Sequence, residues 1–465
     1  FVNISDEAKA SHTVEAAVNR FQNLSDRFTA YADAVDGKAV NFTRADFAAS
    51  FPTAPTAADL TAPEEIMYAF GTYTPDYYDD ADPEPVTGAE TGLSVLSMRG
   101  ASYDDPMWEQ LLDQLTPKKM AEFIYAGNQG TTPLRGIELP ATDATDGPAG
   151  LKQYGGLGMS TSGNFNCSST LLAATWNIDL AEDFGYSVAS EALIANKNGW
   201  YAPGLDMHRS AFGGRNFEYY SEDPIISGFM CAYTVQGCAQ KGLICYFKHF
   251  ALNDREEHRI DEAGFCVWVN EQALREIYLK AYEIAVETPV VTLKYLSDDG
   301  EVLYKDMRAA TAIMSSFNRI GETWAGGCSA LLNEVLRREW GFLGTVITDF
   351  NGYPFMFVEL GVKNGNDLML SNVATIPTKI EDPKNKSTIK YMRQAVKNCA
   401  YTTVNSNAVN GKSQTTTVTY DMSPWKKLLF GLDGVLAAAV IVLIVIFIVK
   451  RKKAGKTTIE VKNAE

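Results

Sequence analysis

Between Asp105 and Val404 the sequence alternates between short apolar runs and longer segments whose apolar residues recur at helical spacing. This alternation predicts strands and helices that follow one another along the chain, and therefore a parallel sheet wound with helices. Enough units are present for an α/β fold of the (β/α)8 TIM-like barrel type. The predicted strands lie within residues 136–146, 199–206, 242–250, 309–318, 344–350 and 366–370.

The predicted helices occupy the intervals between these strands and the two ends of the region. One interval differs, because residues 289–307 hold two β-rich runs around Ser-Asp-Asp-Gly, which predicts a hairpin inserted in a barrel loop. The segments with helical spacing are 106–125, 179–197, 226–240, 270–287, 329–340 and 388–404.

Residues 1–104 begin with a helical pattern from Val14 to Tyr31 and then become rich in Pro, Thr, Asp and Ala. We expect a helical segment followed by a linker, and we interpret the acidic run at 76–84 as a solvated loop without chemistry. The barrel is expected at 105–404 and a polar stalk at 405–427.

Residues 428–449 predict a transmembrane helix, because they carry no charge from Gly434 onward and are long enough to cross a bilayer. A buried core helix is the alternative interpretation. The basic residues from Lys450 to Lys453 place the tail at 450–465 in the cytoplasm and the barrel outside, so we expect a single-pass protein of the cell membrane. A domain outside the cell needs an export signal, which we expect upstream of Phe1.

Composition excludes some partners. The net charge of −16 disfavours nucleic acid, which requires a cationic face. The seven cysteines form no CxxC pair, so neither a zinc site nor a disulfide framework is indicated, and we expect no metal and no cofactor.

Polar clusters follow several predicted strands, at the position where a barrel gathers its active site. Asp146 follows the first strand, Lys248 and His249 follow a run ending in Cys-Tyr-Phe, and Asp349 follows four β-branched residues. An Asp after an apolar strand is also typical of a helix N-cap or a turn, so its position alone does not assign it a role.

Two longer strings accompany these residues, Arg-Asn-Phe-Glu-Tyr-Tyr-Ser-Glu-Asp-Pro at 215–224 and Lys-His-Phe-Ala-Leu-Asn at 248–253. These motifs, in this order, resemble the barrel domain of glycoside hydrolase family 3, the β-glucosidase-like enzymes, over 105–404. The resemblance implies that Asp349 is the nucleophile of a retaining hydrolase, in a Thr-Asp-Phe triplet where the family usually has Ser-Asp-Trp.

The resemblance also implies a set of residues that bind sugar hydroxyls. Charged side chains suit this role, because hydroxyls both donate and accept hydrogen bonds. A nucleophilic Asp near Lys and Arg is expected to keep a low pKa. A structural ion pair beside a core histidine is the alternative for Lys248 and His249. The implied residues are Asp146, Arg215, Lys248 and His249, with Phe317 in the place of a common Tyr and Lys152 in that of a frequent Arg.

A retaining mechanism also needs a second carboxyl as general acid, about 5 Å from the nucleophile. In the β-glucosidase-like branch this carboxyl usually comes from an α/β sandwich domain, which the sequence does not show. Residues 93–115 resemble the linker of members whose sandwich precedes the barrel, so we expect that domain upstream of Phe1. The N-acetylhexosaminidase branch uses a Lys-His-Phe-Pro-Gly-His motif that is lacking here, although His258 keeps this alternative open.

The sequence therefore predicts a membrane-anchored retaining β-glycosidase, incomplete in this chain, whose partners are a glycoside or oligosaccharide substrate and the membrane. The alternative is a catalytically incomplete carbohydrate-binding fragment. The sugar, the linkage and the oligomeric state stay open.

Overall fold

The computed structural model describes residues 71–152, 163–261, 264–267, 269, 271–297, 299–413, 416 and 422–455. The chain divides into two compact units, Phe1–Thr415 and Thr416–Glu465. The helical pattern predicted from Val14 to Tyr31 lies outside the described residues, as do residues 456–465 of the predicted tail.

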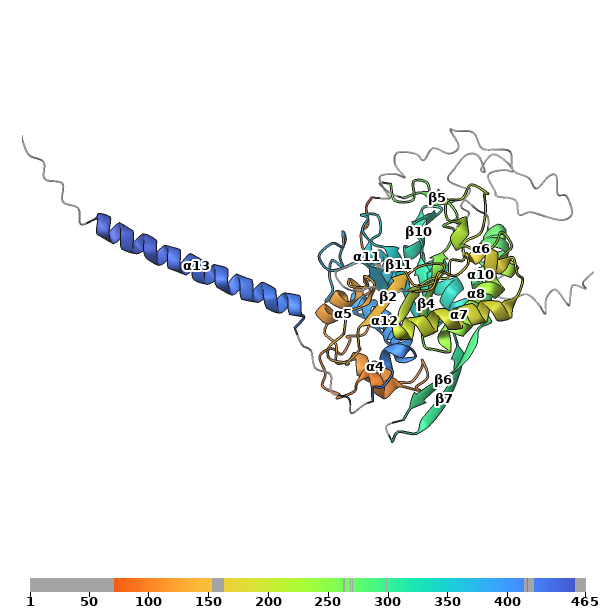
Figure 1. Cartoon of the computed structure of the whole chain (residues 1–465), viewed down its shortest axis with the longest axis horizontal. Coiled ribbons are helices and arrows are strands. Elements are labelled where there is room, and N and C mark those ends of the chain that lie inside the picture. Colours follow the sequence, from red (N-terminus) through yellow and green to blue (C-terminus); the bar gives the residue numbers. More distant parts are fainter. Residues whose placement is uncertain are drawn as a thin grey trace, which may run out of the picture. The chain divides into compact units, whose positions relative to one another are not determined.

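Six parallel strands lie at the centre of the described part of the first unit (Figure 1). Their order in the sheet follows their order in the sequence, and the short strand β1 (Gly130–Thr131) pairs antiparallel at the edge, beside β2. The result is the barrel-like sheet predicted for a TIM-like fold. The six strands are β2 (Thr142–Asp146), β3 (Gly199–Tyr201), β4 (Ile244–Phe250), β8 (Ala312–Ser315), β11 (Thr345–Phe350) and β12 (Leu368–Leu370).

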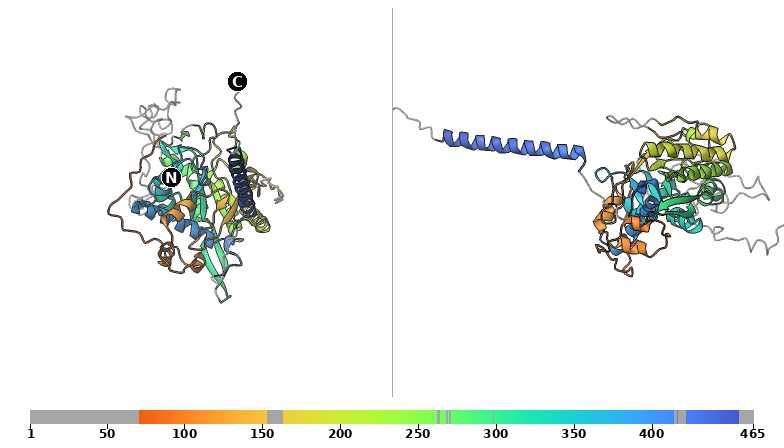
Figure 2. Two further views of the ribbon diagram at one scale, coloured as in Figure 1. Left: turned by 90° about the vertical axis from the view of Figure 1, so that its left-hand side faces the viewer. Right: turned by 60° about the horizontal axis from the view of Figure 1, so that its bottom comes forward.

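Helices connect these strands and cover the sheet. Figure 1 shows α5 and α12 on one side of the strands and α7, α8 and α10 on the other, and the second view in Figure 2 shows α7 and α8 side by side. The helices are α4 (Met107–Leu112), α5 (Pro117–Ile124), α6 (Ser169–Ala173), α7 (Ile178–Ile194), α8 (Pro224–Ala239), α9 (Glu271–Ala273), η4 (Leu274–Tyr278), α10 (Lys280–Glu287), η6 (Ala330–Glu339), α11 (Val358–Lys363) and α12 (Lys386–Val404).

Successive apolar side chains of β3, β4, β8 and β11 alternate between two hydrophobic clusters. In β11, Val346 belongs to the cluster that packs on α7, α8 and α10, whereas Ile347 belongs to the cluster formed with α5 and α12. The parallel register pairs Val346 with Ile313 and Ile347 with Met314, so the same alternation continues in β8. Burial on both faces explains why these strands are continuous apolar runs.

Three predicted helices differ in detail from the structure. The helix expected at 270–287 is divided into α9, the π-helix η4 and α10. The single helix expected at 106–125 is two helices, because Thr116 accepts a hydrogen bond from the Lys119 backbone N–H as an N-cap and Pro117 opens a new helix. The helix expected at 329–340 is a π-helix, η6.

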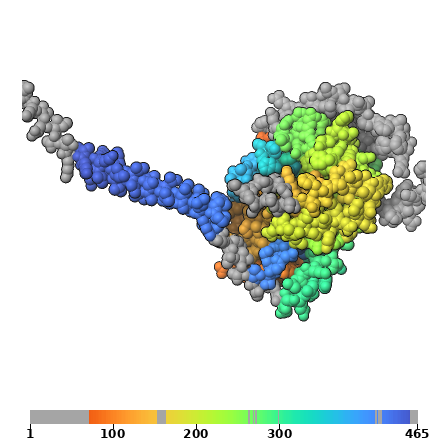
Figure 3. Space-filling view, viewed as in Figure 1, coloured from red at the N-terminus to blue at the C-terminus, as the bar shows by residue number. Residues whose placement is uncertain are grey.

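The hairpin expected at 289–307 is present as β6 (Val290–Leu296) and β7 (Val302–Arg308). It projects from the rest of the unit in Figures 1 and 3, just before β8 begins at Ala312. The hairpin therefore lies toward the amino ends of the parallel strands. The remaining short strands, β5 (Cys266–Val267), β9 (Arg319–Ile320) and β10 (Thr323–Trp324), form a separate three-stranded sheet.

The acidic run at 76–84 is a loop without helix or strand and is mostly exposed to solvent, as expected, but it is also bound to the surface of the unit. Asp76 forms an ion pair with Lys363 of α11, and Asp82 pairs with Lys390 of α12 at 2.7 Å. The Tyr77 hydroxyl donates to Glu359 of α11 at 2.5 Å. The run is thus held along two helices of the unit by contacts that charge composition alone did not reveal.

The second unit contains α13 (Pro424–Ala454), a helix of 31 residues with a mean hydropathy of 3.0 over its most apolar window. By length and composition this helix is able to cross a membrane. Its last turn carries Arg451, Lys452 and Lys453.

Candidate active site

A cavity of about 500 Å³ lies at the carboxyl ends of the six parallel strands. Every one of these strands contributes a residue from its carboxyl half to the wall, which is the arrangement that a barrel uses to assemble an active site. The six residues are Asp146, Tyr201, Lys248, Met314, Asp349 and Leu370.

Lys248 holds two carboxyl groups of this cavity. Its Nζ lies 3.1 Å from Asp146 Oδ1 and 3.2 Å from Glu218 Oε1. Glu218 is also bound by Arg215, whose Nε lies 2.6 Å from Oε2. Burial opposes ionisation of Glu218, but Lys248 and Arg215 outweigh it and lower the pKa of this carboxyl. Glu218 is therefore an anion that fixes two cations in place.

His249 is buried between Arg215 and Asp206. Arg215 NH2 lies 3.1 Å from Nε2, and because a guanidinium only donates, Nε2 must accept and the ring proton must lie on Nδ1. Nδ1 faces Asp206 Oδ2 at 3.2 Å and the Tyr219 hydroxyl at 3.1 Å. Burial lowers the pKa of His249 well below its ordinary value, and Arg215 lowers it further. The imidazole is therefore neutral, and its contact with Asp206 is a hydrogen bond.

Asp349 lies near the end of β11, with 14% of its side chain exposed. Oδ1 accepts a hydrogen bond from the Phe350 backbone N–H at 2.7 Å, and Oδ2 lies 3.6 Å from His249 Nε2. Burial raises the pKa of Asp349, although Lys248 and Arg259 partly offset this. The expectation of a low pKa was wrong, because removal from water outweighs the neighbouring cations.

A second arginine accompanies Arg215 in the wall. Arg259 Nε lies 2.9 Å from Glu256 Oε2, and Arg215 NH1 lies 3.5 Å from Oε1 of the same carboxylate. Sequence reasoning missed Arg259 and Glu218 as site residues. Glu218 belongs to the polar cluster that follows β3, and Arg259 belongs to the one that follows β4. Their positions after strand ends were the available signal.

The structure brings six of the seven predicted site residues to this cavity: Asp146, Lys152, Arg215, Lys248, His249 and Asp349. The seventh is not in the wall. Phe317 is buried with Trp324 and Phe355, and its ring lies under Arg259 at 4.9 Å. The Phe317 ring therefore packs against the Arg259 guanidinium as a cation–π partner.

Lys152 and His258 lie in different surroundings. Lys152 is exposed at the wall, and its backbone N–H donates to the Asp146 carbonyl at 2.6 Å, which closes the loop after β2. His258 is not in the wall, and 66% of its side chain is exposed beside Asp261, 2.6 Å away.

The site places the carboxyl group of Asp349 in a wall with four cationic side chains. Such a set can form charge-assisted hydrogen bonds to a ligand rich in hydroxyls, while the carboxyl group faces the same space. The cations are Lys152, Arg215, Lys248 and Arg259.

Residues 119–295 match the family described as glycosyl hydrolase family 3 N terminal domain. β-Glucosidase A of Butyrivibrio fibrisolvens is 34% identical over 269 residues, which cover 56% of this chain and 29% of that protein. β-Glucosidase B of Emericella nidulans is 33% identical over 252 residues, which cover 54% of this chain and 27% of that protein. The chain thus spans less than a third of the length of these relatives.

Solved structures agree with these matches. β-Glucosidase 3B of Thermotoga neapolitana, in complex with glucose, has a TM-score of 0.54 and 28% identity over 64% of this chain and 42% of that chain. A β-glucosidase of Paenibacillus barengoltzii has a TM-score of 0.59 and 24% identity over 77% of this chain and 37% of that chain, which supports the fold alone. The sequence match and the shared fold together support a β-glucosidase-like barrel domain of glycoside hydrolase family 3 in this chain.

Proposed function

We propose that this chain provides the barrel of a retaining β-glycosidase of the β-glucosidase type, with Asp349 as the nucleophile. One observation carries this proposal. Of the three carboxyl groups described in the cavity wall, Asp146 and Glu218 both hold Lys248, whereas Asp349 contacts a backbone N–H and a neutral imidazole. Asp349 is therefore the carboxyl group that is not already neutralised by an ion pair at the cavity.

In the proposed reaction an Asp349 oxygen attacks the anomeric carbon of the substrate. The bond from that carbon to the aglycone oxygen breaks, and a general acid gives its proton to the departing oxygen. Water, deprotonated by the same group, then attacks the anomeric carbon, releases the sugar and restores the Asp349 carboxylate. Asp146, Lys152, Arg215, Lys248 and His249 bind the hydroxyls of the sugar in this proposal.

The role of general acid must be taken by a group other than those described in the cavity wall. Glu218 is a poor candidate because its lowered pKa keeps it ionised, and Asp146 is bound to Lys248. We therefore place the acid in a domain that packs over the cavity mouth and is not among the described residues. The carboxyl must come within about 5 Å of Asp349 for retention.

The proposal also includes a membrane anchor. The length and apolar composition of α13 support a single span, and the basic residues at its end support a cytoplasmic tail. The barrel would then act on glycosides outside the cell.

Comparison of leaving groups tests the enzymatic proposal. Without a positioned general acid, hydrolysis is expected to slow by a factor of about 10² to 10⁴ for an alkyl glucoside. Dinitrophenolate leaves with little protonation, so this chain should release it much faster than an alkanol. Glucose binding without any release of dinitrophenolate would contradict the proposal and favour a carbohydrate-binding role.

A further inference from the structure

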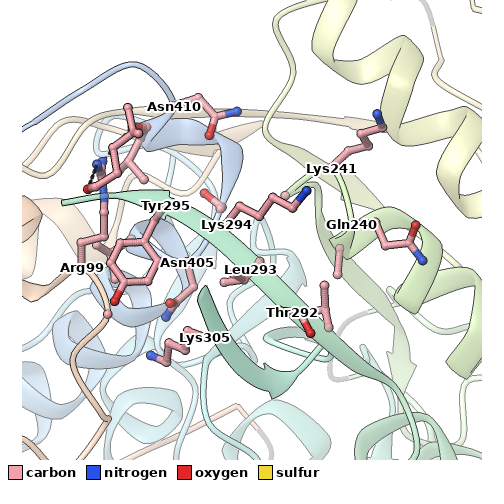
Figure 4. A pocket seen from close by; sticks show the side chains of 18 of the residues that line it. Arg99, Gln240, Lys241, Thr292, Leu293, Lys294, Tyr295, Lys305, Asn405 and Asn410 are labelled. Carbon is pink, nitrogen blue, oxygen red and sulfur yellow. Dashed lines mark hydrogen bonds between the residues drawn. The ribbon is translucent and has the colours of Figure 1, made fainter. Parts of the chain in front are cut away.

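A second and larger cavity, of about 900 Å³, runs along β6 of the hairpin, which we call the β6 groove. All residues of β6 from Val290 to Leu296 line it. The other walls come from the end of α8, with Gln240 and Lys241, and from the chain after α12, with Asn405 and Asn410 (Figure 4). The groove lies toward the amino ends of the strands, away from the Asp349 cavity.

The charge of the β6 groove is opposite to that of the chain. Arg99, Lys241, Lys294 and Lys305 line it, and its described lining contains no Asp or Glu, although the whole chain carries −16. Lys305 donates to the neutral carbonyl of Ala101 at 2.7 Å, and burial lowers its pKa. Positive charge in this groove therefore favours an anionic ligand.

Two of these cations contact neutral groups. Arg99 NH2 donates to the Val409 carbonyl at 2.9 Å. Lys241 Nζ lies 4.4 Å from the centre of the Tyr186 ring. A carbonyl or an aromatic ring orients a cation. The register pairs Lys305 with Leu293, the neighbour of Lys294, so Lys294 and Lys305 lie on opposite faces of the hairpin. We call the four cations, which line the groove from both faces, the basic wall.

The backbone of β6 adds a second feature. Two hydrogen bonds of 2.8 Å bracket the hairpin, from the Ala309 N–H to the Pro289 carbonyl and from the Ser297 N–H to the Glu301 carbonyl. Together with the register, they place the hydrogen-bonded pairs of the antiparallel ladder at odd-numbered residues of β6. The N–H and C=O groups of Thr292 and Lys294 consequently point away from β7. Within the described residues, β6 pairs with no strand other than β7. The middle of β6 is thus an open strand edge along the groove.

We propose that the β6 groove binds an extended acidic peptide segment of a partner protein, which adds to β6 as a third strand. Strand addition pairs the peptide backbone with Thr292 and Lys294, while alternate acidic side chains meet the basic wall. A small anion would use the charge but not the strand edge. A second copy of the hairpin would bring Lys294 and Lys305 against the same cations, so self-pairing is disfavoured.

The probe for this proposal is a fluorescein-labelled heptapeptide in which Glu alternates with Val, titrated into the full chain by fluorescence anisotropy. We expect saturable binding that weakens by about tenfold or more between about 0.05 M and 0.5 M NaCl, because screening reduces charge attraction. The same peptide with Lys in place of Glu should not bind. Equal binding of the Glu and Lys peptides would overturn the proposal.

Two N-methylated versions of the Glu peptide separate strand addition from simple charge attraction. Methyl groups on the alternate amides that face β6 remove the donors and should weaken binding by about tenfold or more, whereas methyl groups on the other amides should be tolerated. If both versions bind like the parent peptide, strand addition is refuted. Displacement of the peptide by oligogalacturonate at an equal concentration would assign the groove to acidic glycans and also refute it.

A pair of charge reversals completes the test. Lys294→Glu should weaken the peptide by about tenfold or more. Lys118→Glu, at an exposed position of α5 outside the groove, changes the net charge equally and should leave binding unchanged. Release of dinitrophenolate by both variants should match that of the parent chain, which shows that they fold. Equal peptide affinity of the two variants would contradict the proposal.

Discussion

His249 Nε2 lies 3.6 Å from Asp349 Oδ2 and yet donates no hydrogen bond to it, because Arg215 already donates to that nitrogen. The imidazole therefore faces the carboxyl group as a neutral, non-donating ring. In the described structure Oδ2 has no hydrogen-bond partner, and the single donor to the carboxyl group is the Phe350 N–H on Oδ1. A carboxylate with so few donors is destabilised as an anion and is correspondingly more reactive.

The first prediction concerns the pH dependence of kcat/KM. Asp349 must be ionised to attack, so activity should fall as the pH drops through its raised pKa, which lies above the ordinary value of about 3.9. Arg259 lowers this pKa, so Arg259→Gln should move the acid limb to higher pH. The measurement is the rate of dinitrophenyl glucoside cleavage against pH. Arg338→Gln, on the surface of η6, is the matched control, and a limb that moves to lower pH in Arg259→Gln would be inconsistent with this electrostatic account.

The second prediction is that Asp349→Asn abolishes turnover and stabilises the fold. The amide is not a competent anionic nucleophile. A raised folded-state pKa means that folding disfavours the anion, so the variant should gain about 1.4 kcal/mol for each pKa unit at pH values above the folded pKa. The gain should vanish at about pH 3, where both states are protonated. Urea unfolding at the two pH values measures this, and a variant that is less stable at neutral pH would show that the carboxylate is stabilised by the fold.

The third prediction concerns the carboxyl groups held by Lys248. Lys248→Met should destabilise the fold by about 3 kcal/mol, because Glu218 and Asp146 both lose their ion pair with Lys248. Glu218→Gln in the same chain should restore part of this loss, since the two residues interact directly. Urea unfolding of the two single variants and the double variant gives the coupling energy. Additive losses would mean that the 3.2 Å contact contributes nothing.

The fourth prediction concerns topology. In intact cells that express the chain, a tag after Glu465 should resist added protease, while the barrel should be accessible. Permeabilised cells provide the control, in which both are cleaved. A cleaved tag with a shielded barrel would reverse the proposed orientation, and release of the uncleaved chain by a high-salt wash would exclude a span.

Local sequence was sufficient for most of the strands and for the positions of their polar ends. Apolar runs predicted β3, β4, β8, β11 and β12, whereas 136–146 was expected to be a strand and then a loop and instead has its strand, β2, at the end. Strand ends pointed to Asp146, Lys248 and Asp349, because the carboxyl ends of parallel strands must meet. The pKa of Asp349 was not predictable in this way. It depends on how completely the fold removes the side chain from water, which no spacing of residues reveals.

Other features depend on contacts between distant segments. Phe317 lies in a buried cluster next to Arg259, although the family resemblance implied that it binds the sugar. The ion pairs of the acidic run near Asp76 were not predictable, because the cationic partners, Lys363 and Lys390, are about 300 residues away in the sequence. Charge runs of this kind show their role only after the helices that carry the partners are placed.

The most direct test of the central claim is mass spectrometry of the purified chain after exposure to a 2-fluoro dinitrophenyl β-glucoside. The fluorine slows release of the sugar, and a missing base slows it further, so the glycosyl ester should accumulate. The account predicts one fluoroglucosyl adduct, mapped to the peptide that contains Asp349 and absent from Asp349→Asn. An adduct on Asp146 or Glu218, or dinitrophenolate release with no adduct on any peptide, would contradict Asp349 as the nucleophile.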